Sequence, residues 1–385
     1  MLVDTLGTGM LGPFDLLYGH AADHLSVTLA GIALSIGTAV AIPAGPVAGT
    51  LVDRLGVVPV TLLANAVSAA GTVWLLLSHG VLGFLGAVIV MAAGSRMFWA
   101  AFSPLVGLVT AGARRDWFGR IRSVRYAGLA GGQAVAGAVL LLGQVRGLHL
   151  LVAGDAVSFV LAGFCLAIGA GRATAMPRPV ARDQMGGYRA VVRDPLNVAA
   201  AGLNILATLV IQAPYLAMPI LVLDQLHLPA WLPGSLGALN TVAVAVPVFF
   251  IGALTRARRA FDVLAIAAGL WVLGTGVYVL APDGRVLAWA VLPLGMALLG
   301  VGEAFYAPTA DSLPLELAPP GLAGRYAAFH QLAWGISGAV APTLAAFCLA
   351  GGPSDLWIVL AAVALLLVIA YERLAPALDR RLGAV

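Results

Sequence analysis

Long apolar runs dominate this sequence. About twelve stretches, each near the roughly 20 residues that cross a bilayer as a helix, follow one another along the chain. A chain that is 61% apolar and 10% charged lacks the polar residues to cover soluble domains of this total length, so an all-α membrane protein is predicted. The spans are placed at 2–19, 27–51, 57–78, 81–110, 124–143, 149–170, 196–222, 231–254, 263–281, 286–308, 326–350 and 355–373.

The placement of basic residues tests this helix count. All 21 basic residues are arginine, and with the excess of alanine and glycine this indicates a GC-rich bacterial genome. If twelve helices alternate across the membrane, eighteen arginines fall on the side of both termini. Only Arg146 and Arg285 fall on the other side, and Arg96 lies inside a span. Basic loops stay in the cytoplasm, so both termini are predicted to be cytoplasmic in a bacterial inner membrane.

The chain is predicted to consist of two related halves. The segment 171–195, rich in arginine, proline and glycine, follows the sixth span and is interpreted as a cytoplasmic linker between a six-helix half at 1–170 and another at 196–385. Matching residues recur at offsets of 201 to 205 positions: Pro13 and Pro214, Gly49 and Gly252, Pro104 and Pro308, Gly119 and Gly324. Two six-helix halves related by a parallel repeat are a known transporter architecture.

The loop between the second and third spans carries a recognisable motif, "GTLVDRLG". It resembles the signature of the major facilitator superfamily, with Val57 and Val58 where two basic residues are usual. The resemblance implies alternating access around a site between the halves. It also implies that the motif acts as a conformational latch, the alternative for Arg54 being a topological anchor only. The matching residues are Gly49, Asp53, Arg54 and Gly56.

The fifth and sixth spans are similar to the drug-efflux branches of that superfamily, particularly the macrolide-efflux and siderophore-exporter-like group. In the sixth span, Asp155, Ala156, Ser158 and Phe159 match the segment that carries this similarity. The fifth span holds a degraded antiporter motif, in which Gln133 takes the place of a proline. This motif consists of Gly128, Gly132, Gln133 and Gly137.

Charged residues inside apolar spans are costly and are therefore candidates for function. A carboxyl removed from water prefers its neutral form, which suits proton coupling or the binding of a cation. Asp4 is the first choice, with a helix cap as its alternative, and Arg96 is interpreted as a coupling or substrate-orienting residue or as half of a structural ion pair. The candidates for proton coupling or substrate contact are Asp4, Asp15, Arg96, Asp155 and Glu303.

Several aromatic residues fall in spans that can line a cavity. A cavity with aromatic walls suits bulky amphipathic substrates, although packing alone explains many aromatic residues in membrane helices. The candidates are Phe98, Phe102, Tyr215, Phe305 and Tyr306.

No enzyme, cofactor or metal site is predicted. His20 and His24 flank Asp23 with a spacing that metal ligands can have, but they fall in a short loop outside the membrane and are interpreted as solvated. Without lysine the chain has no nucleotide-binding Walker motif.

The predicted activity is export of a hydrophobic or amphipathic small molecule, a drug or secondary metabolite, by proton antiport. The main alternative is a proton-coupled importer of a sugar or small metabolite, and a third is a transporter-like scaffold or sensor. The expected partners are the substrate, protons and the lipid bilayer, with no nucleic acid, and the expected state is a monomer.

Overall fold

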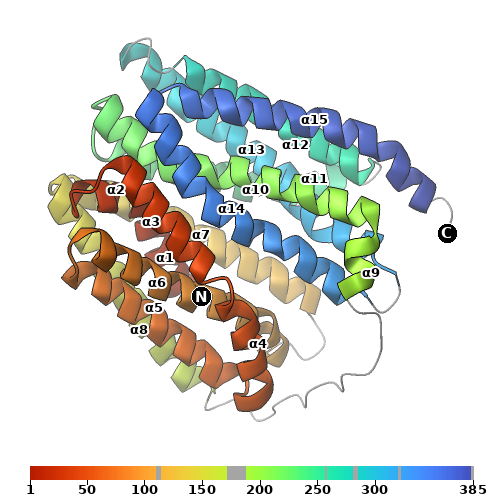
Figure 1. Cartoon of the computed structure of the whole chain (residues 1–385), viewed down its shortest axis with the longest axis horizontal. Coiled ribbons are helices and arrows are strands. Elements are labelled where there is room, and N and C mark those ends of the chain that lie inside the picture. The colour runs from red at the N-terminus through yellow and green to blue at the C-terminus, as the bar shows by residue number, and fades with distance from the viewer. Residues whose placement is uncertain (110–113, 171–187, 256–257, 281–284, 320–321, 383–385) are drawn as a thin grey trace. The chain divides into compact units, whose positions relative to one another are not determined.

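The computed structural model describes residues 1–109, 114–170, 188–255, 258–280, 285–319 and 322–382, and these residues are helical apart from short connections (Figure 1). The predicted linker at 171–195 lies largely outside them. The helices are α1 Leu2–Leu11, the 3-10 turn η1 Gly12–Phe14, α2 Asp15–Ala21, α3 Val27–Val40, α4 Ala44–Leu55, α5 Val57–Leu77, α6 Gly80–Val109, α7 Arg114–Leu140, α8 Gln144–Ala170, α9 Tyr188–Arg193, α10 Pro195–Ile220, the π-helical turn η2 Leu221–Gln225, α11 Leu232–Leu254, α12 Ala260–Val279, α13 Arg285–Leu317, α14 Ala323–Gly351 and α15 Asp355–Leu382.

Ten helical stretches in the described part of the chain are long and apolar enough to cross a membrane. The other two predicted spans correspond to α1 with η1 and α2, and to α7. The first is divided into pieces of 10, 3 and 7 residues. The second has the length of a span but begins with several arginines. The chain is therefore a multi-pass helical membrane protein.

Proline explains where the first two spans depart from continuous helices. Pro13 lies in η1 and lacks the N–H that an α-helix needs, so the ladder changes to a 3-10 turn before α2 begins at Asp15. The second predicted span, 27–51, ends as α3 at Val40 and restarts as α4 after Pro43. The residue before a proline avoids the helical region, which favours a break here.

The chain forms two compact units. Unit 1 consists of Met1–Ala181 and Leu216–Ala238. Within it, α1 packs against α7 and α8, α5 packs against α6 and α8, and α3 and α4 both contact α6 (Figure 1). Glycine allows the crossing of α1 and α7, because a Cβ on Gly9 would lie 2.6 Å from the Leu129 carbonyl oxygen.

Unit 2 consists of Arg182–Tyr215 and Leu239–Val385. Its core is α12, which packs against α13 and α15 (Figure 1). Large aromatic residues fill this core: Tyr278 and Trp357 lie 4.3 Å apart between ring centroids, and Phe261 stacks on Tyr371 at 5.9 Å. α10 and α11 each begin in one unit and end in the other.

Candidate functional site

Two of the predicted acids act electrostatically on a third in unit 1. Asp4 in α1 and Asp155 in α8 are buried, with 7% and 3% of their surfaces exposed. The charges of Asp15, at the start of α2, and of Asp4 both act on the Asp155 carboxyl group. We call Asp4, Asp15 and Asp155 the carboxyl group cluster.

The packing of α1 on α8 places the Asp155 side chain against a glycine. A Cβ added to Gly7 would lie 2.6 Å from Asp155 Oδ1 and would overlap the Ser158 hydroxyl. Ser158 Oγ donates a 2.8 Å hydrogen bond to the Asp155 carbonyl oxygen. Asp155 Oδ1 and Asp15 Oδ1 are both enclosed and have no hydrogen-bond partner among the residues that the structure describes. An enclosed carboxylate oxygen without a donor is costly, and protonation removes that cost.

One basic residue of α7 acts on this cluster. The charge of Arg125 acts on Asp4, and the Arg125 guanidinium also stacks on the Trp99 ring at 4.7 Å from its centroid. Arg96, in the neighbouring α6, is half-buried. Among the residues that the structure describes, no carboxylate lies within ion-pair distance of Arg96.

The predicted aromatic residues lie in separate places. Phe98 and Phe102 pack on each other and on Trp99 along α6 in unit 1, with ring centroids 5.2 to 6.0 Å apart. Tyr306 in α13 is buried and packs on Trp271 at 5.4 Å, in unit 2. The remaining candidates, Tyr215, Glu303 and Phe305, are half-buried members of unit 2.

The loop signature shows one residue whose backbone requires glycine. Gly56 joins α4 to α5 with φ of +89°, a region that side chains other than glycine rarely adopt. Arg54 is exposed, and a Cβ on Gly49 would meet nothing within 4 Å. The side chain of Asp53 lies outside the described part of the structure. The described residues thus account for the turn in this motif.

The glycine motif of α7 contacts two different helices. A Cβ on Gly128 would lie 3.0 Å from the Leu2 carbonyl oxygen, and one on Gly132 would lie 2.9 Å from the Met10 amide nitrogen, so both glycines face α1. On the following turn, a Cβ on Gly137 would lie 2.7 Å from the Trp231 carbonyl oxygen.

Gln133 also belongs to this second contact. A Cβ on Gly237 of α11 would lie 2.9 Å from the carboxamide carbon of Gln133. The start of α11 therefore packs closely on α7 within unit 1.

A polar stripe that was not predicted from the sequence joins α10 to α14 in unit 2. Asn204 Nδ2 donates to the His330 carbonyl oxygen at 3.1 Å, and His330 Nε2 lies 3.2 Å from Asn197 Oδ1. Further along, Gln212 Nε2 donates to Ser337 Oγ at 2.5 Å. The Tyr306 hydroxyl donates to Asn204 Oδ1.

A sequence signal for this stripe exists. Asn197, Asn204, Thr208 and Gln212 are spaced by 7, 4 and 4 residues, which places them on one face of a helix. His330 and Ser337 are seven residues apart on α14 in the same way.

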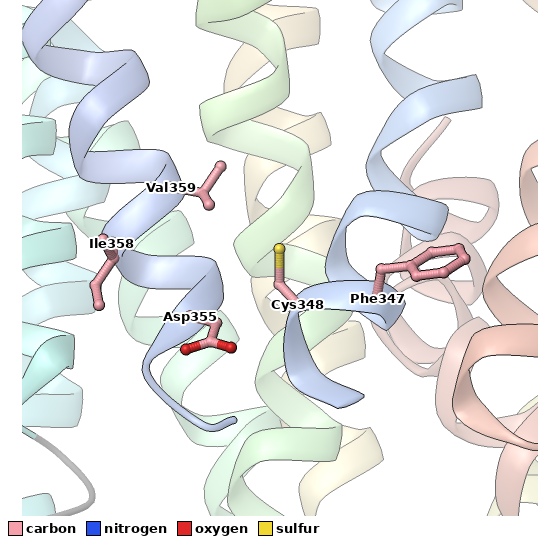
Figure 2. Close-up of a pocket in the computed structure, with 5 residues that line it drawn as sticks. All are labelled: Phe347, Cys348, Asp355, Ile358 and Val359. Carbon is pink, nitrogen blue, oxygen red and sulfur yellow. The ribbon is translucent and has the colours of Figure 1, made fainter. Parts of the chain in front are cut away.

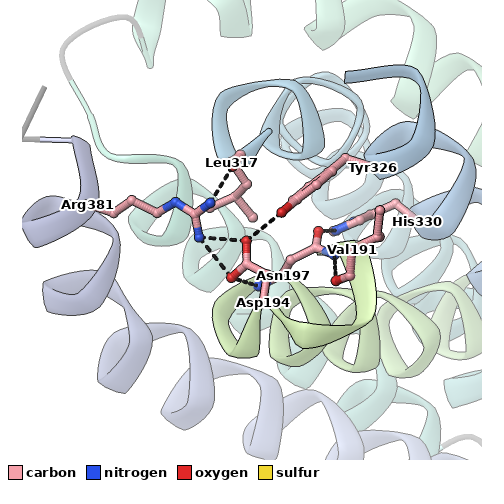
Figure 3. A network of polar contacts seen from close by, with 7 residues as sticks. All are labelled: Val191, Asp194, Asn197, Leu317, Tyr326, His330 and Arg381. Atoms are coloured by element: carbon pink, nitrogen blue, oxygen red, sulfur yellow. Dashed lines mark hydrogen bonds and ion pairs between the residues drawn. The ribbon is translucent and has the colours of Figure 1, made fainter. Parts of the chain in front are cut away.

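A second polar network that was not predicted holds the ends of unit 2 helices together (Figure 3). Asp194, between α9 and α10, accepts bonds from Arg381 Nη1 at 2.8 Å and from the Tyr326 hydroxyl at 2.8 Å. Burial alone would raise the pKa of Asp194, but the bonds from Tyr326, Arg381 and the Asn197 amide outweigh it and hold this pKa below its ordinary value.

Two surface hollows occur in unit 2, each of about 430 Å³. One is lined by Phe347, Cys348, Asp355, Ile358 and Val359, as Figure 2 shows. The other borders the Asp194 network. Neither contains a residue of the predicted site.

Comparison with known proteins places the chain in a family. The Major Facilitator Superfamily profile matches residues 1–342, and the chain belongs to this family of membrane transporters. The chain is similar to the uncharacterized MFS-type transporter YttB of Bacillus subtilis (strain 168), with 25% identity over 139 residues. That alignment spans 36% of this chain and 35% of the relative, so it covers about a third of each.

Solved structures of transporters share the fold. The nucleoside transporter NupG matches with a TM-score of 0.78 and 12% identity, over 97% of this chain and 98% of that one. The peptide transporter POT in complex with sulfate matches with a TM-score of 0.80 and 14% identity, over 98% and 93% of the two chains. At these identities the similarity concerns the fold alone.

Proposed function

We propose that this chain exports a hydrophobic or amphipathic small molecule across the bacterial cytoplasmic membrane in exchange for protons. The observation that carries this proposal is Asp155. Its carboxyl group is enclosed, has one oxygen without a hydrogen-bond donor, and is within electrostatic reach of Asp15 and Asp4. A buried carboxyl group that two other carboxylates act on cannot carry charge at low cost in an apolar bundle, which suits Asp155 to taking up a proton.

The proposed roles of the other predicted residues follow from their surroundings. Arg125 lies within electrostatic reach of Asp4 and can stabilise its charged form when the cluster releases a proton. Arg96 is available to an anionic group of a substrate or to a carboxylate that approaches during transport. The loop motif around Gly56 is proposed to act as the conformational latch of an alternating-access cycle.

Export rather than import is supported by the polar groups of the helices. In unit 2 the polar side chains of α10 and α14 bond one another, which leaves these groups partly satisfied before any substrate arrives. Phe98, Trp99 and Phe102 present apolar surface in unit 1. Such surroundings suit an apolar substrate better than a sugar. The alternative of a proton-coupled importer of a sugar or small metabolite is tested by the same experiment.

The test is transport by the purified protein in liposomes with an imposed pH gradient. Candidate substrates come from a drug-susceptibility panel in an efflux-deficient host that expresses the chain. We expect uphill, gradient-dependent export of a protective compound, and loss of uphill movement in Asp155→Asn with binding retained. Asp262→Asn is the matched control, because Asp262 is an exposed acid of α12. Gradient-driven uptake of a nutrient, with no protection by the panel, would replace export by import.

A further inference from the structure

Histidines gather at one end of unit 1. The chain has six histidines, and five of them lie in or beside the connections on the side predicted to face away from the cytoplasm. His20 ends α2, His24 precedes α3, and the others follow the same side of the bundle at His79, His149 and His227. Histidine is the side chain used most often for proton-dependent switching near neutral pH, so a ring here that faces a carboxylate is a candidate for such a switch.

One of these histidines faces a carboxylate from a distant part of the chain. His20 Nε2 lies 3.8 Å from Asp224 Oδ2, and the two side chains are 37% and 27% exposed. Asp224 belongs to the π-helical turn η2. Its other oxygen, Oδ1, accepts a 3.4 Å hydrogen bond from Gln144 Nε2 at the start of α8. Asp224 Oδ2 is enclosed and has no hydrogen-bond donor in the described part of the chain, so it can accept one more bond.

The proton on Nδ1 of His20 determines how Nε2 of the same ring interacts with Asp224. His20 Nδ1 lies 2.7 Å from the Leu25 carbonyl oxygen. A carbonyl oxygen only accepts, so Nδ1 must carry a proton. The neutral ring then presents a lone pair at Nε2 toward the Asp224 carboxylate, which repels it. The protonated ring presents an N–H and a positive charge there, and attracts it.

The histidines at this end act electrostatically on two different aspartates. His20 and His227 both act electrostatically on Asp224. His24, His79 and His149 act on Asp23, in the loop after α2. Among these histidines, the geometry given above places His20 Nε2 in front of an oxygen of Asp224, whereas His227 Nδ1 lies 3.3 Å from the Leu223 carbonyl oxygen of its own segment.

Asp224 lies in a segment whose attachment matters for movement. Leu216–Ala238 belongs to unit 1, although the helices on both sides of it, α10 and α11, continue in unit 2. Two contacts join this segment to the rest of unit 1. Gly234 packs closely on Gly137, and Asp224 makes polar contacts. Any motion that moves this segment away from the rest of unit 1 must break these contacts.

We propose that His20 and Asp224 form a proton-operated latch that fastens the segment Leu216–Ala238 to unit 1. Protonation of His20 by the solvent on that side closes the latch, and deprotonation loosens it. An acidic exterior thus favours the state in which the segment is attached. The latch is separate from the carboxyl group cluster and works whichever direction the substrate moves.

The test measures the attachment directly. Nitroxide labels are placed at Ala22 and Ala230, both within unit 1, after Cys165 and Cys348 are replaced by serine. Distances are measured by pulsed electron paramagnetic resonance in lipid nanodiscs at about pH 5 and pH 8. We expect a short distance at low pH and an additional longer one at high pH. Labels at Ala22 and Leu141 serve as a reference pair that does not respond.

Variants assign the response to the two residues. His20→Asn keeps a donor for the Leu25 carbonyl but loses Nε2, and Asp224→Asn keeps an acceptor for Gln144 but loses the charge. Both are expected to show the same distances at both pH values. His20→Arg, which is always charged, is expected to stay closed at both. The matched control His79→Asn should respond like the parent protein, because His79 acts on Asp23 and not on Asp224.

Two results would overturn the latch. One is a parent protein whose distances do not change with pH or lengthen at low pH. The other is a response that survives in His20→Asn. The measurement on the parent protein can refute the proposal by itself. The test therefore does not depend on whether every variant folds.

Discussion

Arg381 near the end of α15 binds Asp194 at the start of α10, and the two residues are 187 positions apart. Nη1 of the arginine lies 2.7 Å from one carboxylate oxygen and 2.8 Å from the other, while its Nη2 donates to the Leu317 carbonyl oxygen at the end of α13 (Figure 3). A hydrogen bond in which both donor and acceptor are charged is stronger than a neutral one, and here a single guanidinium nitrogen faces both carboxylate oxygens. The contact ties three helix ends of unit 2 together.

Removing this arginine should weaken unit 2. The Asp194 side chain is only 9% exposed, so Arg381→Ala leaves a largely buried carboxylate with fewer donors. We expect a loss of about 2 kcal/mol, the value typical of hydrogen bonds to a charged group. Thermal unfolding in detergent measures it. Arg380→Ala is the matched control, because Arg380 bonds only the Pro376 carbonyl of its own helix among the described residues. Equal losses in both variants would contradict this role.

The same contact predicts a dependence on acidity. The pKa of Asp194 is lower in the folded protein than the unfolded value of about 3.9, so its charged form stabilises the fold. This contribution is fully present above the unfolded pKa and is lost as pH falls through the folded pKa. Asp194→Asn should remove that part of the acid sensitivity, measured as the melting temperature from about pH 3 to 7. An unchanged pH profile would count against it.

A close helix crossing predicts the effect of a single methyl group. Gly132→Ala places a Cβ 2.9 Å from the Met10 amide nitrogen, so α1 and α7 must separate. We expect a loss of stability of about 1 to 3 kcal/mol. The neighbouring Gly131 has open space around it, and Gly131→Ala should be neutral or slightly stabilising because alanine favours helix. Thermal melting of the two variants compares them, and equal melting temperatures would exclude the crossing as the cause.

The predicted orientation can be tested by labelling. In a background without Cys165 and Cys348, cysteines at His79 and Leu141 should react with an impermeant thiol reagent added outside intact cells. Cysteines at the exposed positions Arg54 and Arg258 should react only after the membrane is opened. The opposite pattern would place the termini outside.

Ten of the twelve predicted spans are long apolar helices in the described part of the chain, and they could be predicted because apolar length is a local property. The breaks near Pro13 and Pro43 also had a local signal, since each proline lacks an N–H, but Pro247 and Pro342 occur within continuous helices. Whether a proline breaks a helix therefore depends on its neighbours in space.

Contacts between side chains far apart in the sequence could not be predicted from local sequence patterns. Asp15 and Asp155 are candidates in the sequence because they are charged within apolar runs, yet nothing in the sequence says that Gly7 brings α1 onto Asp155. Asp194 and Arg381 look like ordinary members of polar, arginine-rich segments. Their pairing depends on how α10 and α15 pack, and it became visible only in the folded chain.

Each of the helices α10 and α11 belongs partly to unit 1 and partly to unit 2. This division predicts how the protein tolerates being split into two chains. If the chain is divided at 171–195, the segment Leu216–Ala238 lies on the second piece. In the folded protein this segment belongs to unit 1, whose other residues lie on the first piece. The first piece alone would present the Gln133 and Gly137 surface of α7 to lipid without its cover. For two co-expressed pieces to assemble, the second piece therefore has to donate this segment to the first. A chimera with a foreign second half is expected to assemble only if the corresponding segment carries glycine at the positions of Gly234 and Gly237.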